Sequence, residues 1–317
     1  MTALHFTRIN KVCGVLVSYN PDPIELKNNI TVILNQVDQL IVVDNGSNSD
    51  IRAQLANLAN PNITLLDLGE NTGVANAYNV GINKALALGF DFALLLDQDS
   101  LPEKNMVSHL LSVLTNDVTK KSVVAGPVYK TESDPTGSFF VDVQPNKVRR
   151  IYPEDTSEPK IECSMLISSG SLLRLSLWQQ VGEYREDLFI DHVDTEWCFR
   201  AVAKGFHLYG VPKALLFHSL GENSVRMWLF RWRQIPIHDP IRNYYTVRNS
   251  LRLYKMEHVA SVWVKHDVIR LIMLMLFSIT LCDKKIKRLK MIVIGSYDGI
   301  LEKTALPWGK KNMAKEL

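Results

Sequence analysis

The 317-residue chain lacks several patterns that would place a protein at once in a known class. Its four cysteines (Cys13, Cys163, Cys198 and Cys282) lie far apart and form no CxxC pair, so we expect neither a zinc site nor a disulfide framework. No GxGxxG motif follows any early apolar stretch, which excludes a dinucleotide-dependent dehydrogenase. The first residues contain no long apolar region and no small-residue cleavage site, so we predict no secretory signal.

Long apolar runs are scarce as well. The run from Leu271 to Cys282 is only 12 residues long, whereas a helix that crosses a bilayer needs about 20. The strongly basic stretch DKKIKRLK follows it directly. This combination is typical of a helix that lies in a membrane interface or is buried at the end of a protein.

The net charge is only +3, but it is unevenly distributed. Residues 1–225 carry 18 lysines and arginines against 26 acidic residues, whereas residues 226–317 carry 18 against 7 and four of the six tryptophans. We therefore expect one domain over residues 1–225 and a basic, Trp-rich helical region over residues 226–317 that associates with an anionic membrane surface. The alternative is a helical appendage packed on the first domain or, in a homo-oligomer, on a second subunit. No recognised nucleic-acid-binding module is present, so nucleic acid is not an expected partner.

Apolar stretches alternate with helical patterns over the first hundred residues. Four stretches predict buried strands, namely KVCGVLVSYNP, QLIVVDNGS, NITLLDL and DFALLLDQD, and three segments with helical spacing separate them. This order predicts an α/β fold with a mostly parallel, Rossmann-like sheet flanked by helices on both faces. Residues 131–160 are rich in proline, serine and charge, and predict a long irregular excursion near the substrate.

Polar side chains stand where the predicted strands end. Asn20, Asp44 and the pair Asp97 and Asp99 all fall at carboxyl ends of strands, where ligands bind in such sheets. Alternate side chains of a strand share a face, so on the fourth strand Asp97 and Asp99 are expected to point the same way and Gln98 opposite. Two convergent carboxylates favour Mg²⁺ or Mn²⁺. The alternative is a pair that caps the turn in the sequence DSLP.

Several motifs together resemble one enzyme family. VLVSYNP, IVVDNGS, ENTGVANAYNVGI, LLLDQDS, VDTEWCFRA and LFHSLG occur in the order typical of inverting family 2 glycosyltransferases with the GT-A fold. The resemblance covers roughly residues 12–221 and is strongest to a bacterial rhamnosyltransferase branch, in which DQDS is a usual form of the metal motif. Each motif alone is weak evidence, but their order is specific. The fold expected is therefore GT-A with a C-terminal helical extension.

The resemblance implies a nucleotide pocket and a metal site. The nucleotide would be bound by Asn20, Asp44, Asn71, Gly73, Asn79 and Asp97, with Asp44 accepting a hydrogen bond from the pyrimidine base and glycine allowing close approach of the backbone. For Asp44 the alternative is a turn before the sequence NGS. The metal, Mg²⁺ or Mn²⁺, would be held by Asp99 and Asp97, with His218 as a third ligand or a diphosphate contact.

The resemblance also implies a catalytic base. Asp194 occupies the position of the family's base, although Val193 replaces the acidic residue that often precedes it. Asp191 lies one turn earlier and is a rival, and Glu196 is expected to contact the acceptor or to orient the helix. The alternative is that these three acidic residues only complement the dipole at the N-terminus of a helix.

The resulting hypothesis is an inverting, metal-dependent hexosyltransferase. It would move L-rhamnose from dTDP-L-rhamnose to a lipid-linked oligosaccharide during O-antigen or capsule synthesis, as a peripheral protein on the cytoplasmic face of the bacterial plasma membrane. Another nucleotide sugar is the first alternative. A nucleotidyltransferase is a more distant one, because SYNPDPIEL lacks the Gly-rich basic loop usual in that class. A scaffold without catalytic activity is a third.

Overall fold

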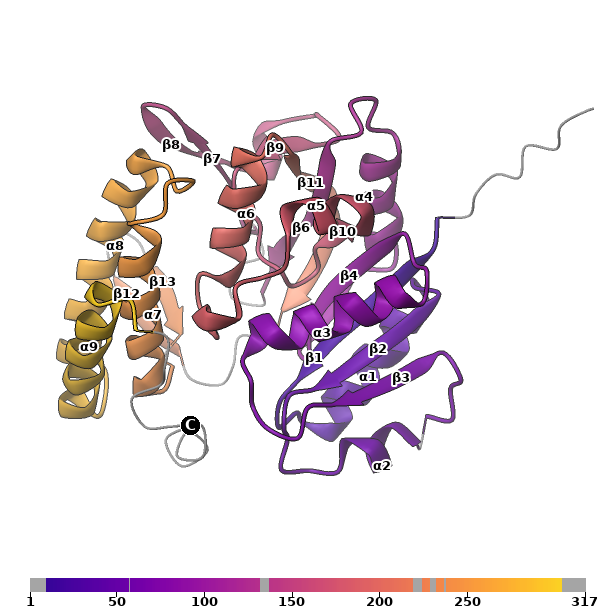
Figure 1. The fold of residues 1–317 in the computed structure, drawn as a ribbon, viewed down its shortest axis with the longest axis horizontal. Coiled ribbons are helices and arrows are strands. Elements are labelled where there is room, and N and C mark those ends of the chain that lie inside the picture. The colour runs from indigo at the N-terminus through magenta and orange to yellow at the C-terminus, as the bar shows by residue number, and fades with distance from the viewer. Residues whose placement is uncertain are drawn as a thin grey trace, which may run out of the picture.

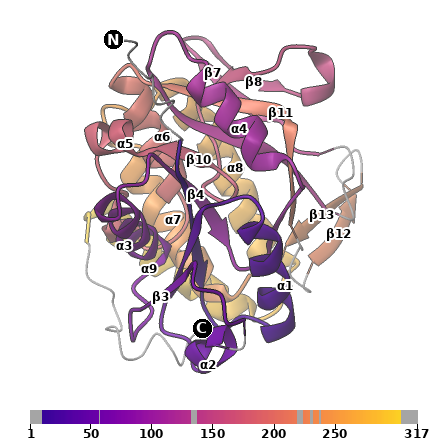
Figure 2. The ribbon, with the colours of Figure 1, turned by 90° about the vertical axis from the view of Figure 1, so that its right-hand side faces the viewer.

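The computed structural model describes residues 10–56, 58–131, 137–218, 224–228, 232–236 and 238–303. Within them, nine strands form a central sheet in the order β3-β2-β1-β4-β10-β6-β11-β5, with β9 beside β11. Helices cover both faces of the sheet, and α7, α8 and α9 stand together on one side of it (Figure 1). In the view turned by 90°, α1 and α4 lie in front of the sheet and the three C-terminal helices behind it (Figure 2). The predicted mixed, mostly parallel α/β sheet with flanking helices is confirmed.

The first part of the chain alternates between strand and helix as its apolar pattern predicts. Its elements are β1 (Val12–Ser18), α1 (Pro23–Leu34), β2 (Gln39–Asp44), α2 (Ile51–Ala56), β3 (Ile63–Asp67), α3 (Val74–Ala87) and β4 (Phe92–Asp97). All three pairings among these strands are parallel. The register sets Ser18 opposite Asp44, Asp44 opposite Asp67, and Val17 opposite Asp97. The polar strand ends therefore meet along one edge of the sheet.

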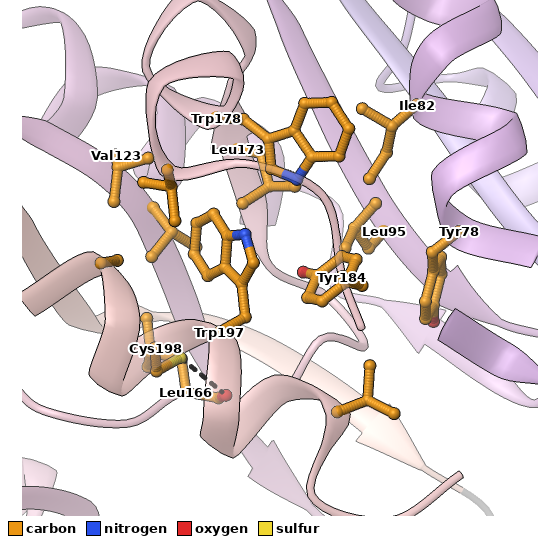
Figure 3. Close-up of a cluster of buried hydrophobic side chains, with 14 of the residues drawn as sticks. Tyr78, Ile82, Leu95, Val123, Leu166, Leu173, Trp178, Tyr184, Trp197 and Cys198 are labelled. Atoms are coloured by element: carbon orange, nitrogen blue, oxygen red, sulfur yellow. Dashed lines mark hydrogen bonds between the residues drawn. The ribbon is translucent and has the colours of Figure 1, made fainter. Parts of the chain in front are cut away.

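The sheet is buried on both faces because its strands are almost continuously apolar. Along β1, Val15 and Val17 pack in a cluster with α3, α5 and α6, whereas Leu16 packs in a second cluster with α1, α2 and α4. Figure 3 shows part of the first cluster, in which Trp178 and Trp197 are 2% and 1% exposed. Truncating such a fully buried aromatic to alanine costs about 3–5 kcal/mol of stability. This cluster anchors α3 and α6, which both contribute side chains to the cavity described below.

The second part of the chain completes the sheet with mixed pairing. Its elements are β5 (Ser100–Pro102), α4 (Met106–Thr115), β6 (Ser122–Lys130), β7 (Phe140–Gln144), β8 (Lys147–Ile151), the 3₁₀ helix η1 (Pro153–Asp155), β9 (Ile161–Cys163), β10 (Leu172–Arg174), α5 (Leu175–Val181), the 3₁₀ helix η2 (Glu186–Leu188), α6 (Val193–Ala203) and β11 (His207–His218). Antiparallel β10 is inserted between β4 and β6. Residues 207–218 form one long strand with an irregularity between Gly210 and Leu215.

The excursion over residues 131–160 is more regular than its composition predicts. Residues 140–151 form the β7–β8 hairpin, which packs against β9 and α8. Figure 1 shows this hairpin at the end of the molecule nearest α8. The described residues of the excursion do not line the cavity at the sheet edge, and their position near the substrate stays a prediction. In this half-solvated, two-stranded ribbon, polar and charged side chains alternate with Val141, Val143 and Val148. Its strands therefore contain no apolar run, and a search for apolar runs does not find them.

The C-terminal region contains a hairpin and three helices. These are β12 (Ser224–Trp228), β13 (Trp232–Pro236), α7 (Pro240–Leu253), α8 (Ser261–Thr280) and α9 (Lys285–Ile300). Helix α9 packs closely against α7, and two glycines allow this. A Cβ atom at Gly295 would lie 2.6 Å from the carbonyl oxygen of Tyr244, and one at Gly299 would lie 2.9 Å from that of Arg248. In the part of the chain that the structure describes, no helix combines the length and apolarity that crossing a membrane requires.

Candidate active site

A cavity of about 700 Å³ opens where β1 and β4 end. Ligand pockets usually have volumes of roughly 300–1,000 Å³. One wall is the sheet edge with the start of α3, a second is the turn at residues 167–169, a third is the segment 189–194, and the fourth is α7 with His238, which lies two residues before that helix. The lining residues are Val17, Tyr19, Asn45, Asn71, Gly73, Val74, Tyr78, Asp97, Gln98, Asp99, Ile167, Ser168, Ser169, Phe189, Ile190, Asp191, His192, Val193, Asp194, His238, Ile241, Arg242 and Tyr245.

Asp97 and Asp99 both line this cavity. They do not reach it as alternate residues of one strand, as the sequence analysis predicted. Strand β4 ends at Asp97, and residues 98–99 form a turn before β5. A tight turn therefore brings Asp99 to the cavity, and Gln98 lines the cavity as well instead of pointing away. The Gln98 side chain accepts a hydrogen bond from the backbone N–H of Tyr19 at 2.8 Å, which ties this turn to the end of β1.

A buried tyrosine holds the carboxylate of Asp97. The hydroxyl of Tyr78, on α3, donates a hydrogen bond to Oδ1 of Asp97 at 2.7 Å. Burial and the neighbouring charge of Asp97 raise the pKa of Tyr78 well above its ordinary value. The phenol therefore stays protonated and keeps donating at any physiological pH, which fixes one oxygen of Asp97; within the part of the chain that the structure describes, no hydrogen bond occupies the other.

Asp194 lies at the first turn of α6 with its carboxylate at the cavity wall. Its Oδ1 accepts a hydrogen bond from the N–H of Thr195 at 2.8 Å, and Oδ2 accepts one from the N–H of Ser168 at 3.3 Å. Burial raises the pKa of Asp194 from 3.8 to about 6, and the nearby charge of Asp191 acts in the same direction. A carboxylate with this pKa, facing a cavity, has the properties required of a general base near neutral pH.

Asp191, the rival base, is committed to an ion pair. Its carboxylate accepts hydrogen bonds from Nε and Nη2 of Arg242 at 2.9–3.2 Å and from the hydroxyl of Thr246 at 3.0 Å. Burial works against its charged form, yet the guanidinium of Arg242 holds the pKa of Asp191 below its ordinary value. Asp191 lines the cavity, but its lowered pKa and paired oxygens make it a poor proton acceptor.

Glu196 is completely buried and does not line the cavity. Both carboxylate oxygens accept hydrogen bonds from Arg200 at 2.9 Å, and His258 lies 3.0 Å from Oε1. Arg200 in turn donates to the carbonyl groups of Val181 and Glu183. These contacts correspond to the second of the two roles expected for Glu196, which is to orient helix α6.

Three of the predicted nucleotide-binding residues lie outside the cavity lining. The Asn20 side chain accepts a hydrogen bond from the N–H of Asn48 at 2.8 Å, and Asp44 accepts one from the N–H of Ser47 at 3.0 Å, which is the turn contact considered as its alternative. Asn79 is 2% exposed and exchanges two hydrogen bonds of 2.9 Å with the backbone of Tyr184. Their contacts with a nucleotide stay a prediction.

The other predicted residues, and some that were not predicted, form the sheet side of the cavity. Asn71 and Gly73 line it, together with Tyr19 and Asn45. The amide of Asn45 donates to Oδ1 of Asn71 at 3.1 Å, so two loops are joined at the pocket. Tyr19 and Asn45 each lie one position from a residue chosen from the sequence, Asn20 and Asp44 respectively. Tyr19 and Asn45 therefore add to the residues chosen from the sequence at these two strand ends, and the roles of Asn20 and Asp44 stay a prediction.

The side chain of His218 lies outside the described residues. The strand register alone places it, because the backbone of His218, at the end of β11, pairs with Ser100. Ser100 directly follows Asp99 in the chain. Its role as a third metal ligand therefore stays a prediction.

The wall before α6 is a strained segment. Phe189, Asp191 and His192 have φ angles of 66°, 60° and 63°, and each left-handed non-glycine residue costs roughly 1–2 kcal/mol. Surrounding structure must impose such strain, which is often found at functional sites. On one side the N–H of Val74 donates to the carbonyl of Phe189 at 2.9 Å, and a Cβ at Gly73 would lie only 2.6 Å from the Phe189 ring.

Helix α7 supplies the wall that sequence reasoning did not find. Tyr245 stacks on Phe189 with ring centroids 4.8 Å apart, and Arg242 pairs with Asp191. These residues lie about fifty positions after the segment they contact, beyond the boundary drawn at residue 225. The sequence signal was the four-residue spacing of Ile241 and Tyr245, which places both on one helix face, but that helix was assigned to a separate region.

Residues 15–182, just over half of the chain, match the model of the family Glycosyl transferase family 2. The chain belongs to glycosyltransferase family 2. This family 2 glycosyltransferase is 30% identical over 291 residues to the dTDP-rhamnosyl transferase RfbF of Shigella flexneri, an alignment that covers 92% of this chain and 96% of the relative. It is 22% identical over 272 residues to the poly-beta-1,6-N-acetyl-D-glucosamine synthase of Staphylococcus aureus, which covers 82% of this chain and 64% of that protein.

Solved structures share the fold of the glycosyltransferase. A crystal structure of GalNAc-T7 with UDP, GalNAc and Mn²⁺ matches with a TM-score of 0.57 at 12% identity, over 98% of this chain and 58% of that one. Staphylococcus aureus TarS 1-349 in complex with UDP matches with a TM-score of 0.55 at 14% identity, over 93% of this chain and 82% of that one. At these identities the likeness concerns the fold alone, and it confirms the predicted GT-A-like architecture.

Proposed function

We propose that this glycosyltransferase transfers L-rhamnose from dTDP-L-rhamnose to a lipid-linked saccharide, with inversion at the anomeric carbon, in the synthesis of an O-antigen or capsule. The observation that carries the proposal is one cavity at the sheet edge that is lined by Asp97, Asp99 and Asp194, a half-buried carboxylate with a raised pKa. The choice of rhamnose rests on the similarity to a dTDP-rhamnosyl transferase along almost the whole chain.

The residues at the sheet edge fit a divalent cation that arrives with the donor. Among the described residues, no three His, Cys, Asp or Glu side chains gather in a way that could hold a metal ion by themselves. Mg²⁺ and ions like it are, however, commonly bound by one or two carboxylates plus the phosphates of the substrate. Asp97 and Asp99 supply that number. When bound, Mg²⁺ or Mn²⁺ would supply positive charge to the departing diphosphate.

The chain's own groups account for the proton transfer. Asp194 is ionised above pH 6 or so, and it would take the proton of the acceptor hydroxyl as that oxygen attacks the anomeric carbon. Attack from the face opposite the diphosphate gives inversion. The stacked rings of Phe189 and Tyr245 and the side chain of Ile190 line the same cavity, and this apolar wall helps to exclude water that would otherwise hydrolyse the donor.

A donor panel tests the proposal. The full-length protein is incubated with Mn²⁺ and, separately, with dTDP-L-rhamnose, UDP-N-acetylglucosamine, UDP-N-acetylgalactosamine and other nucleotide sugars, and free nucleoside diphosphate is measured. We expect slow hydrolysis without an acceptor to be fastest with dTDP-L-rhamnose and to require the metal. Faster release from a UDP-sugar would replace rhamnose by another donor. Pyrophosphate release from a nucleoside triphosphate would favour the nucleotidyltransferase alternative.

The outer helices suit the anionic membrane on which a lipid-linked acceptor would lie. Helix α8 exposes an apolar stripe at one- and two-turn spacing, and α9 exposes another; both helices lie on the outer side of α7 in Figure 1. Lys285 and Lys290 are exposed beside the α9 stripe. A stripe of apolar side chains flanked by lysines matches the boundary between acyl chains and anionic headgroups. The exposed apolar residues are Val268, Ile269, Ile272, Met273, Leu276, Ile286, Leu289, Val293, Tyr297 and Ile300.

Vesicle binding tests this surface. We expect the double variant Ile269→Glu/Leu289→Glu to bind phosphatidylglycerol vesicles at least tenfold more weakly than the wild type, because each buried aliphatic side chain contributes about 1.5–3 kcal/mol. Val118→Glu is the matched control, since Val118 is 93% exposed but lies between α4 and β6. Unchanged binding in a vesicle sedimentation assay would remove the membrane from the proposal. A wild-type dimer that the double variant converts to monomer, without vesicle binding, would assign the surface to a second copy.

A further inference from the structure

One polar residue of α7 is buried against the strained segment before α6. Asn249 is 0% exposed. Its amide nitrogen lies within hydrogen-bonding distance of three carbonyl oxygens of that segment, those of Leu188 at 2.8 Å, Ile190 at 2.7 Å and Asp191 at 2.9 Å. The two N–H groups of one side chain thus lie against three of the four carbonyl groups from Leu188 to Asp191, and the carbonyl of Leu188 also accepts a hydrogen bond from the N–H of Ile190.

The residues on either side of Asn249 contact the same segment. The Nε of Arg248 donates to Oδ1 of Asn249 at 2.9 Å, which fixes the amide with its nitrogen towards the segment, and Nη2 of Arg248 donates to the carbonyl of Leu188 at 3.0 Å. The hydroxyl of Ser250 lies 2.9 Å from Nε2 of His192. Arg248, Asn249 and Ser250 are all 0% exposed, and we refer to them as the α7 clamp.

The segment that the α7 clamp holds leads directly into α6, the helix that carries Asp194. His192 is the left-handed residue that immediately precedes α6, and Asp194 is the second residue of that helix. The direction in which α6 starts, and therefore the place of the Asp194 carboxylate, follows from the φ angles of residues 189–192. Three of those four residues hold an unfavourable φ, so without an external constraint the segment would relax to a different path.

We propose that the α7 clamp, and Asn249 above all, positions the catalytic carboxylate of Asp194 by holding the segment 188–192 in its strained conformation. This inference rests on the proposed function of Asp194. Asn249 does not line the cavity. It acts on the reaction only through the backbone that it binds, so it is a positioning residue and not a catalytic one.

Helix α7 offers a matched comparison for Asn249. Asn243 lies on the same helix and is 8% exposed, but its amide donates to Ser278 on α8 at 3.0 Å and its oxygen accepts from Arg288 on α9 at 3.1 Å. Replacing either asparagine by aspartate keeps the size of the side chain and the bond to the neighbouring arginine. At Asn243 the Ser278 hydroxyl can turn and donate instead, whereas at Asn249 the carbonyl oxygens cannot.

The experiment compares Asn249→Asp with Asn243→Asp in the full-length protein. Turnover of the donor found in the panel, affinity for its nucleoside diphosphate with Mn²⁺, and hydrogen exchange of the backbone over residues 186–196 are measured for each. For Asn249→Asp we expect faster exchange in that segment and a fall in kcat of about 100-fold, the size usual for a catalytic group displaced by roughly 1 Å. Affinity for the nucleotide should change less than about threefold, because its proposed contacts lie on the sheet side. Asn243→Asp should resemble the wild type in all three.

Several outcomes would overturn the inference. These are an Asn249→Asp protein with faster exchange but wild-type kcat, equal losses of kcat and nucleotide affinity, or equal effects of both asparagine variants. If Asn249→Asp does not fold, Ser250→Ala, which removes only the hydroxyl beside His192, should lower kcat about tenfold without changing affinity, and wild-type kcat there would count against the clamp. If the wild type turns over no donor, the proposed function fails; exchange in the segment still tests whether Asn249 constrains it.

Discussion

Replacing Asp194 by asparagine is expected to abolish sugar transfer while leaving the protein folded and able to bind the nucleotide. An amide of the same size cannot accept a proton, and loss of a general base lowers the rate by about 10²–10⁴-fold. Donor affinity should be unchanged, because Asp97 and Asp99 are intact. The measurements are kcat with donor and acceptor, and nucleotide affinity in the presence of Mn²⁺. Wild-type turnover in Asp194→Asn would remove this residue as the base.

The same variant, Asp194→Asn, is expected to be more stable than the wild type near neutral pH although it is inactive. The folded-state pKa of Asp194, about 6, lies above its unfolded value near 3.8. The folded protein therefore holds this proton more tightly, and stability falls as pH rises from about 4 to about 6. Above pH 6 the ionised carboxylate costs up to about 3 kcal/mol. Asp194→Asn should thus be about as stable as the wild type below pH 4 and more stable at pH 8, and in the active wild type kcat/KM should fall below pH 6.

Asp191→Asn provides the contrast that separates the two candidate bases. Its carboxylate pairs with Arg242, which is partly exposed, and losing hydrogen bonds to a charged group typically costs about 1.5–3 kcal/mol. We expect this variant to lose stability at every pH above its lowered pKa, with the base still in place. Loss of activity in Asp191→Asn without loss of stability would favour Asp191 as the proton acceptor instead.

The second large effect is expected from Asp99→Ala. The variant should lose the part of nucleotide binding that depends on Mg²⁺ or Mn²⁺, at least about 100-fold, since even outer partners of a metal site contribute 10–100-fold. Isothermal titration with dTDP, with and without metal, measures this difference. Asp67→Ala is a suitable control, because Asp67 ends β3 at the same edge of the sheet but lies outside the cavity lining. Metal-dependent binding that survives in Asp99→Ala would remove this residue from the site.

The parts of the fold that could be predicted from the sequence are those that depend on the pattern of neighbouring residues. Strands buried on both faces must be continuously apolar, and helices between them must repeat at helical spacing, so β1 to β4 were found with nearly correct bounds. Carboxyl ends of parallel strands meet at one edge, which located the cavity. The strands of the hairpin β7–β8 were not predicted, because a half-solvated ribbon does not require apolar runs.

The site was predictable only in part because some of its geometry is set by residues far apart in the chain. Asp99 reaches the cavity through a turn and not through strand alternation. Phe189, Asp191 and His192 adopt left-handed angles although none is glycine, so no local signal marks the strained segment. Asn249 is polar and helical, and on local rules it belongs at a solvated surface; its partners lie about sixty residues earlier.

Gly295 and Gly299 have a mechanical consequence. With no side chains between them, the backbones of α9 and α7 are in direct contact at these two positions, which lie one helical turn apart. Close-packed interfaces deform little and transmit displacement. A tilt of the outermost helix must therefore carry its inner neighbour along with it. Helix α7 in turn contacts the carbonyl groups of residues 188–191 beside the cavity, so a displacement of the outermost helix is expected to reach that segment.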